Sequence, residues 1–480
     1  MTRDGRLGLA LLVAAVALGV AGDVLFRGRP VGINVLVWAF LFVAALAALL
    51  RVGRVPLHQG RRWMAAPLLV FAAAFAWHDS PLLVAVDLLA LAGAVALGAL
   101  RRTAPRVARA GVADYAAGLA AAGFSTFAGA VHLLHRDVPW DEAGRGLRGS
   151  RAGAFARGLA IALPLLALFG GLFLAADAVF KSFVVAALPN PRTLWLHALV
   201  IAAFGWGAAG LLRDLVAARE ERRLFSPAIA VPRRPGSTEI AVAVAVLDLL
   251  FLAFVLVQLR YLFGGKGLVE ARAHLTYATY ARHGFFELVA VAVLVLPVVL
   301  AANTLARGRA TRIASAALVL LLFVVIASAL QRMRLYEQQF GLTELRLYAT
   351  GSILWLATVF VWLGVTVLRG RPERFAFGAL VAGFVASAAI NVLDPDALIA
   401  RTNLSRPHVD VAYLAGLSDD AVPTLLARLP SVRPELRQPL ARALLARGEP
   451  RGGLLSWNYA RDRAAELLAR DRSELERLAR

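Results

Sequence analysis

The hydrophobic residues of this chain fall into long, nearly uninterrupted runs, and polar residues gather in the short segments between them. The runs are roughly 17 to 25 residues long, the length at which a helix rising about 1.5 Å per residue crosses a bilayer core of about 30 Å. The pattern therefore predicts an all-α protein, a polytopic bundle of about eleven transmembrane helices. The predicted spans are residues 7–26, 31–50, 64–77, 82–100, 159–176, 194–212, 240–259, 286–302, 313–330, 349–368 and 375–393.

Residues 111–134 form a weaker hydrophobic stretch that is open to two interpretations. Its many Ala and Gly residues would suit close helix packing in a membrane, but it also carries polar residues such as Asp114. A crossing here would reverse every later span and place the basic loops around Arg309 and Arg371 outside. We therefore expect a cytoplasmic or membrane-surface helix within a linker of residues 111–157.

Beyond Leu393, Pro, Arg, Asp and Glu become frequent, and no run is long enough to span a membrane. The sequence Asp394-Pro395-Asp396 predicts a helix start, with an N-cap, a proline at the first helical position and an acid in the first turn. Capping explains these two acids better than metal binding does. The sequence Ser418-Asp419-Asp420 follows the same pattern and predicts a second helix start. Residues 460–480 predict an amphipathic helix that packs on its own domain or on the membrane surface.

These patterns divide the chain into four expected regions. They are four N-terminal spans in residues 1–110, the linker 111–157, a seven-span core in 158–393 and a small polar helical domain in 394–480.

The composition supports a membrane location. Hydrophobic residues make up 60% of the 480 residues, and the mean hydropathy is +0.69, whereas soluble proteins are about 45–50% apolar. A net charge of +21 in a soluble chain would suggest a nucleic-acid partner, but here the 52 basic residues lie mostly between apolar runs. We therefore expect the lipid bilayer as the partner, and no nucleic acid.

The distribution of basic residues predicts the orientation, because arginine-rich loops stay in the cytoplasm. With the N-terminus inside, 27 basic residues fall in inner segments and 11 in outer loops, and the other 14 follow Leu393. An odd number of spans then places the C-terminal domain outside the cytoplasm, in the inner membrane of a bacterium. The first run also resembles a signal peptide, but a retained span is favoured because the run continues through Phe26.

Familiar catalytic and cofactor motifs are missing from the sequence. There is no Cys, no HExxH pair, no Walker phosphate loop and no GxSxG elbow. The eight His residues are scattered, so a histidine metal site would need convergence that the sequence does not indicate. We expect no cofactor and no metal, and whether the protein is an enzyme stays open.

Among the acidic residues inside predicted spans, two are candidates for a functional role in the membrane, because an ionised group costs at least about 2.5 kcal/mol near the centre of a helix. Asp248 is the stronger candidate, because it lies mid-span with no basic residue near it. Asp87 is the weaker one. Either acid fits a proton or cation relay or a substrate anchor, and equally a neutral, hydrogen-bonded Asp that holds two helices together.

A second group of polar residues gathers at the expected outer ends of the later spans, where it predicts an outward-facing binding site. If residues 276–288 are helical, four of their side chains share one stripe. Further polar residues follow the ninth span in one loop, and one ends the eleventh. The alternative is that they are interfacial anchors. The candidates in this group are Tyr277, Tyr280, His283, Glu287, Arg332, Tyr336, Glu337 and Asn391.

The second half of the chain carries several distinctive motifs. They are residues 276–288, 336–337, 341–343, 345–348, 391, 394–401, 403–404, 413–414, 417–418, 420–423 and 457–458. Over residues 156–480 the chain thereby resembles the bacterial membrane-protein family known as domain of unknown function 4173. The resemblance implies a polytopic membrane protein of unassigned activity and gives no mechanism.

Three functions are compatible with this sequence. The first is a transporter or envelope-lipid-handling protein that uses the outer polar residues and Asp248. The second is a sensor or assembly scaffold that binds an extracytoplasmic partner through residues 394–480. The third is a membrane enzyme acting on an envelope lipid or glycan, with Glu287 or His283 as the acid or base.

Overall fold

A computed structural model of the chain describes residues 3–55, 59–99, 107–140, 191–216, 236–263, 285–306, 308–447 and 453–480, with Ala162, Phe169 and Asp177 as isolated positions. Every regular element within these ranges is a helix, which confirms the predicted all-α class. The predicted span 159–176 and the candidates Tyr277, Tyr280 and His283 lie outside the described residues.

Ten helices of the described ranges are long and apolar enough to cross a membrane. They are α1 (Arg3–Phe26), α2 (Ile33–Val52), α4 (Pro81–Ala99), α5 (Val112–His132) with the π-helical turn that follows it, α9 (Pro191–Val216), α10 (Ser237–Phe263), α13 (Phe285–Leu305), α14 (Arg309–Phe340), α15 (Glu344–Thr366) and α16 (Phe375–Leu393). The apolar part of α3 (Gln59–Trp77) is shorter, as the sequence predicted.

The exposed surfaces of these helices are apolar, as a lipid environment requires. On α10, for example, Val246, Leu249 and Leu250 are each more than 60% exposed, while Val244 and Phe251 point into the protein. Water would penalise so much exposed hydrophobic surface, whereas lipid does not. The chain is therefore a multi-pass membrane protein.

The helix α5 and its π-turn together cover residues 112–137, whose length and composition would allow a membrane crossing, so the expected cytoplasmic or membrane-surface helix stays a prediction. One stretch differs from expectation. The helix α14 continues ten residues past the predicted span 313–330, through residues that we assigned to a loop. Residues 331–340 contain neither Gly nor Pro, and the helix ends only at Gly341, whose φ is +83°.

Contacts group the chain into two compact units. The first contains residues 1–30, 34–58 and 120–221. Within it α1 packs along α9, and a Cβ added to Gly19 would lie 3.2 Å from the Cα of Gly205. The absence of side chains at these two positions lets the two backbones approach closely.

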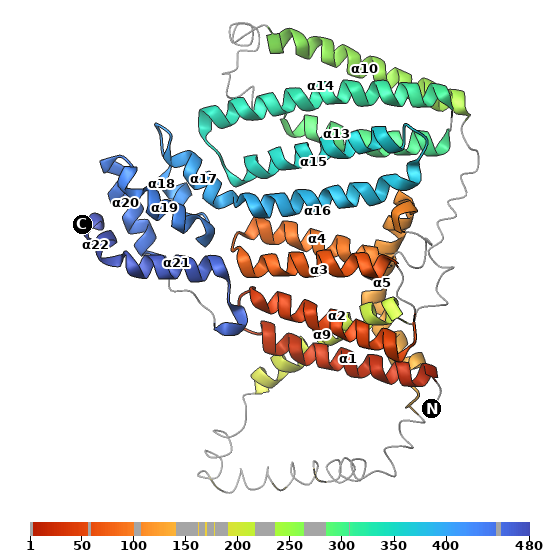
Figure 1. The fold of residues 1–480 in the computed structure, drawn as a ribbon, viewed down its shortest axis with the longest axis vertical. Coiled ribbons are helices and arrows are strands. Elements are labelled where there is room, and N and C mark those ends of the chain that lie inside the picture. The colour runs from red at the N-terminus through yellow and green to blue at the C-terminus, as the bar shows by residue number, and fades with distance from the viewer. Residues whose placement is uncertain are drawn as a thin grey trace. The chain divides into compact units, whose positions relative to one another are not determined.

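The second unit contains residues 31–33, 59–119 and 222–480. Its membrane part has one hydrophobic core formed by side chains of α10, α13, α14 and α15. The helix α16 packs against α15 and α4, and α4 against α3 (Figure 1). The regions expected from sequence order, with boundaries at residues 110, 157 and 393, stay a prediction.

The C-terminal part of the second unit is a small helical domain at one end of these helices (Figure 1). Its helices are α17 (Pro395–Leu404), α18 (Val411–Ala415), α19 (Val422–Arg428), α20 (Pro434–Leu445), α21 (Tyr459–Arg470) and α22 (Arg472–Ala479). They share a separate core that includes Ile399, Leu414 and Leu440. Leu475 of α22 belongs to this core, so the last helix packs on its own domain.

Candidate functional site

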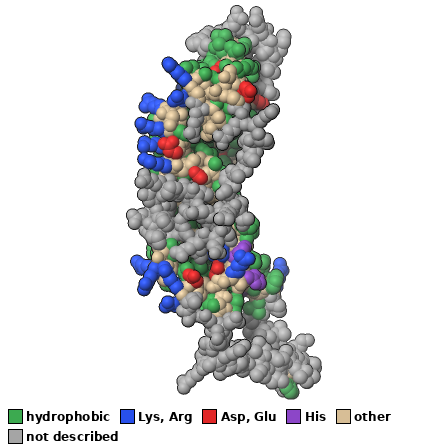
Figure 2. Space-filling view, turned by 90° about the vertical axis from the view of Figure 1, so that its right-hand side faces the viewer, with side chains coloured by type: hydrophobic (Ala, Val, Ile, Leu, Met, Phe, Trp, Pro, Cys, Tyr) green, Lys and Arg blue, Asp and Glu red, His purple; other side chains and the backbone are tan. Residues whose placement is uncertain are grey.

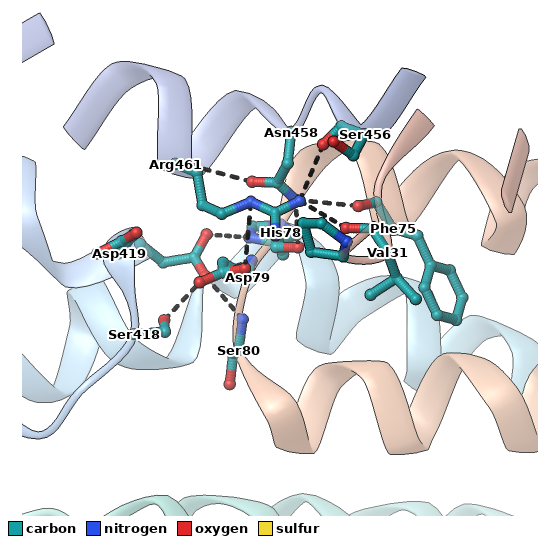
Figure 3. Close-up of polar contacts among 12 residues, drawn as sticks. Val31, Phe75, His78, Asp79, Ser80, Ser418, Asp419, Ser456, Asn458 and Arg461 are labelled. Atoms are coloured by element: carbon teal, nitrogen blue, oxygen red, sulfur yellow. Dashed lines mark hydrogen bonds and ion pairs between the residues drawn. The ribbon is translucent and has the colours of Figure 1, made fainter. Parts of the chain in front are cut away.

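The most polar buried region lies where the turn between α3 and α4 meets the C-terminal domain (Figure 3). Its centre is the carboxylate of Asp420, which is 7% exposed. Oδ1 of Asp420 lies 2.8 Å from Nδ1 of His78. Oδ2 accepts hydrogen bonds from the backbone N–H of Asp79 (2.8 Å) and of Ser80 (3.0 Å) and from the Ser418 hydroxyl (2.9 Å). One carboxylate thus holds a turn that lies more than 300 residues away in the chain.

Local sequence explains why this turn needs an acceptor from elsewhere. Pro81 begins α4 and cannot donate a hydrogen bond, and Ser80 already accepts from Val84 with its carbonyl. The N–H groups of residues 79 and 80 precede the helix and have no acceptor within it. Asp420 supplies that acceptor, although the sequence predicted it only as an acid in the first turn of its own helix.

The C-terminal end of α3 is also held by the C-terminal domain. The Asn458 side chain donates from Nδ2 to the carbonyls of Phe75 (2.9 Å) and His78 (2.8 Å). Arg461 lies 3.6 Å from Asp79 in an ion pair and donates to the carbonyl of Val31. The two bonds from Asn458 satisfy carbonyls that the end of α3 leaves without partners.

Two further acids stand at the start of α17. Asp394 has a left-handed backbone, with φ +51°, and its Oδ1 accepts from the N–H of Ala397 at 3.2 Å, which confirms the predicted N-cap. Asp396 is fully buried, and its Oδ2 accepts from the N–H of Ser418 (3.0 Å) and lies within hydrogen-bond distance of the Ser418 hydroxyl, whose single proton is shared between Asp396 and Asp420. The Oδ1 of Asp396 has no hydrogen-bond partner among the described residues. The hydroxyl of Ser418 therefore links Asp396 to Asp420.

The electrostatics of the cluster reflect an excess of acid. Burial, followed by the charge of Asp420, raises the pKa of Asp394 to about 6, against an opposing effect of His78. Burial likewise raises the pKa of Asp79 to about 6, although Arg461 opposes it. Burial by itself lowers the pKa of His78, but the hydrogen bond and charge of Asp420 raise it above its ordinary value. Burial therefore favours the neutral form of these two carboxyl groups, and Asp420 favours the charged form of His78.

Three of these side chains are arranged as ligands for a cation. His78, Asp394 and Asp420 each offer one ligand atom, and the three atoms lie within 4.8 Å of one another. The His78 ring also donates to the backbone carbonyl of Asn391. Among the described residues, this is the one group of at least three such side chains with metal-ligand spacing.

The polar region continues into the membrane helices. Asn391 of α16 donates from Nδ2 to Oδ1 of Asp87 on α4 at 2.8 Å, and Asp87 is 1% exposed. The hydroxyl of Tyr348 on α15 lies beside the Ser80 hydroxyl and near Asp87 and Asp396. Two buried oxygens here, Asn391 Oδ1 and Asp396 Oδ1, make no hydrogen bond within the described ranges. Such atoms usually mark a place for water, a proton or an ion.

Of the residues proposed from sequence, Asn391 and the weaker candidate Asp87 therefore belong to this region. The other described candidates have other neighbours. Arg332 donates to Gln258 (2.9 Å), the Tyr336 ring lies 4.0 Å below the Arg346 guanidinium, and Glu337 accepts from Thr350 (3.4 Å). Glu287 is exposed.

Asp248 lies half-buried on α10, and its Oδ1 has no partner among the described residues. No contact in the described ranges connects it to Asn391. A single cleft shared by all the sequence candidates stays a prediction.

Sequence analysis missed His78, Asp79, Asp420, Asn458 and Arg461. A usable signal was present at the first two, since His78-Asp79-Ser80 is a short polar turn between two apolar runs, followed by Pro81. The pairing partner was not visible, because nothing in one sequence connects residue 78 with residue 420.

Comparison with known proteins gives one match. The family model described as Domain of unknown function (DUF4153) matches residues 65–427, which is about three quarters of the chain. The resemblance to domain of unknown function 4173 therefore named the wrong family, although the expected class, a multi-pass protein of unknown function, agrees. No curated protein and no solved structure matches the chain.

Proposed function

This chain belongs to the DUF4153 family, and we propose that it is a sensor or assembly scaffold whose C-terminal domain is coupled to the membrane helices. The observation that carries the proposal is the buried contact of Asp420 with the turn between α3 and α4. A change in the domain that moves Asp420 must also move the start of α4.

Contacts at two other turns support a C-terminal domain that is coupled to the membrane helices and not simply attached by a flexible linker. The backbone N–H of Ile33 donates to the carbonyl of Trp457 at 2.8 Å. In the turn between α14 and α15, the side chain of Asn403 accepts from the N–H of Leu342 (2.9 Å) and donates to its carbonyl (2.7 Å). Arg406 reaches back to the carbonyl of Glu337 at the end of α14. The domain thus contacts several helices of the second unit at once.

The ends of the helices support a position of this domain outside the cytoplasm. The helix α14 ends and α15 begins beside the C-terminal domain, so the other ends of both helices lie away from it. Arg309 and Arg312 lie in the first turn of α14, and Arg369 and Arg371 follow the end of α15. Figure 2 views this end of the helices, where basic side chains gather along one edge. By the positive-inside rule the far end is cytoplasmic and the domain is extracytoplasmic.

Transport is a second candidate, supported by Asp248. An acid in a candidate span with a buried oxygen and no described partner is the arrangement expected of a proton or cation relay. The coupling function ranks first because its site is built from several elements, whereas Asp248 has no described polar neighbours.

Complementation separates the two functions. A strain that lacks the gene would be tested for growth under detergent and osmotic stress, and rescued with three variants of the full chain. If the protein is a sensor or scaffold, Asp420→Ala and truncation after Leu398 abolish rescue, while Asp248→Asn rescues fully. If Asp248→Asn abolishes rescue at normal protein amounts and Asp420→Ala does not, the coupling proposal is wrong and transport is favoured.

A physical measurement of coupling is independent of any phenotype. Hydrogen exchange of the purified protein would be followed in the first turn of α4 in the wild type and in Asp420→Ala. Coupling predicts faster exchange at the start of α4 in the variant. Unchanged exchange there would show that the domain is merely attached.

A further inference from the structure

The junction that holds the C-terminal domain has the composition of a metal site. His78 comes from the turn after α3, Asp394 from the end of α16 and Asp420 from the turn before α19. Three separate segments thus deliver one imidazole and two carboxylates to points within 4.8 Å of one another. Ligand atoms around a bound metal ion of this kind are roughly 3 to 3.5 Å apart, given bond lengths of about 2.1 Å. Small side-chain shifts therefore suffice to close the site.

The surrounding contacts orient these groups as ligands. Oδ2 of Asp420 is occupied by two backbone N–H groups and the hydroxyl of Ser418, which leaves Oδ1 directed at His78. The His78 ring donates to the carbonyl of Asn391, the kind of outer contact that fixes the tautomer of a metal-binding histidine. Asp394 uses Oδ1 for its cap, so its other oxygen is available to a cation.

The charge balance and one oxygen atom also favour a bound cation. Asp419 pairs with Arg447 (2.8 Å) and Asp79 with Arg461 (3.6 Å), which leaves three carboxylates, those of Asp394, Asp396 and Asp420, beside the one imidazole of His78 in the described part of the chain. Asp396 is 0% exposed, and its Oδ1 lacks a hydrogen-bond donor in the described part of the chain. A buried carboxylate oxygen without a donor is costly unless a proton or a cation neutralises it.

We propose that His78, Asp394 and Asp420 bind one divalent transition-metal ion, Zn²⁺ or Mn²⁺, at the junction of the C-terminal domain and the turn between α3 and α4. Imidazole together with carboxylates suits these ions, whereas Ca²⁺ and Mg²⁺ prefer sites made of oxygen ligands alone. The chain has no Cys, so thiolate sites are excluded. The proposal stands apart from the proposed function, because it is tested by binding to the purified protein.

The ion would connect three segments that hydrogen bonds already bring together, and it would add its binding free energy to the docking of the domain. Because it neutralises two carboxylates, it also removes part of their mutual repulsion. The expected consequence is a C-terminal domain that is docked more tightly when the metal is bound.

The test uses the full chain, purified in detergent and stripped with a chelator that is then removed. Calorimetric titration with Zn²⁺ and separately with Mn²⁺ should show one ion bound per chain for at least one of them. The key variant is Asp394→Asn, since Asn also adopts a left-handed backbone and caps helices, so the fold is retained. We expect it to weaken binding at least about tenfold, because even changes outside the ligand shell cost roughly 10–100-fold.

Two exposed residues of the same domain provide matched controls. Asp462→Asn and His408→Gln make the same chemical changes as Asp394→Asn and His78→Gln, away from the junction. Both controls should bind the ion as the wild type does. The bound metal should raise the melting temperature of the wild type and the controls, and leave that of Asp394→Asn nearly unchanged.

Three results would overturn the proposal. The first is no saturable binding of either ion by the wild type, which would mean that protons alone neutralise the cluster. The second is equal affinity in the wild type, Asp394→Asn and His78→Gln, which would place the ion on the surface. The third is a preference for Ca²⁺ or Mg²⁺ over both transition metals, which would contradict the assigned class of ion.

Discussion

Nδ1 of His78 and Oδ1 of Asp420 lie 2.8 Å apart, although 342 residues separate them in the chain. Both side chains are nearly inaccessible to solvent. The pair joins the end of a membrane helix to a polar domain, and the stability of that junction is directly measurable.

The first prediction concerns Asp420. Replacing it with Ala leaves the ring of His78 and two backbone N–H groups buried without their acceptor, which should destabilise the junction by about 3–5 kcal/mol. Limited proteolysis of the full chain should release the C-terminal domain much faster than from the wild type. Asp462→Ala, at an exposed position of α21, serves as the control. Equal proteolysis rates in the two variants would show that Asp420 does not stabilise the junction.

The second prediction concerns Gly341, in the turn between α14 and α15. Its φ of +83° disfavours any other residue, and a Cβ there would lie 2.8 Å from Oδ1 of Asn403. Gly341→Ala should therefore displace Asn403 and lower stability by about 1–3 kcal/mol, seen as a lower thermal midpoint in detergent. In the control Gly453→Ala, the added Cβ meets no atom within 4 Å and φ is −97°. A similar loss in both variants would contradict the explanation.

The third prediction is the orientation in the membrane. Because the chain has no Cys, a single introduced cysteine gives a labelling signal without background. Ser473→Cys, in the C-terminal domain, should react with a membrane-impermeant maleimide in intact cells. Arg371→Cys, at the opposite helix ends, should react only after the cells are permeabilised. Both positions are exposed, so accessibility to the reagent depends on the side of the membrane. The reverse labelling pattern would place the domain in the cytoplasm.

The fourth prediction concerns the first unit, where α1 and α9 meet at Gly19 and Gly205. A side chain at Gly205 would contact the backbone of Ala15 at 3.2 Å, so Gly205→Ile should separate the two helices. The amount of folded protein extracted from membranes should fall, as judged by gel filtration in detergent. Gly207→Ile is the matched control, because its nearest neighbour atom lies 3.9 Å away on the side chain of Thr126. Equal yields for the two variants would mean that the close approach is unimportant.

The membrane helices could be predicted from sequence because each depends on its own composition. An apolar run long enough for a bilayer is helical wherever it occurs, so ten of the eleven predicted spans coincide with observed helices. The extension of α14 past Leu330 was not predicted, because the apolar run ends there and polar residues follow. Residues 331–340 nevertheless favour a helix, so α14 continues beyond its apolar part.

The candidate site was largely invisible from sequence, because it depends on tertiary contacts. Asp394 was correctly predicted as an N-cap, since a cap is a local feature. Asp420 fitted the local pattern of an acid in the first turn of a helix, but its carboxylate bonds to the turn at His78. Asn391 was selected for its place at the end of a span, and its contact with Asp87 became visible only when α4 and α16 were seen to be neighbours.

The bond between His78 and Asp420 also has a consequence for biosynthesis, because the turn at His78 is synthesised well before its acceptor Asp420. A ribosome adding about 5–20 residues per second needs roughly 20–70 s to travel from the codon for residue 78 to that for residue 420. During that interval the nascent hairpin of α3 and α4 has its polar turn without the acceptor that completes it. Chains that terminate before residue 420 never acquire this acceptor, so their turn at residues 78–80 stays without the partner that the complete protein provides.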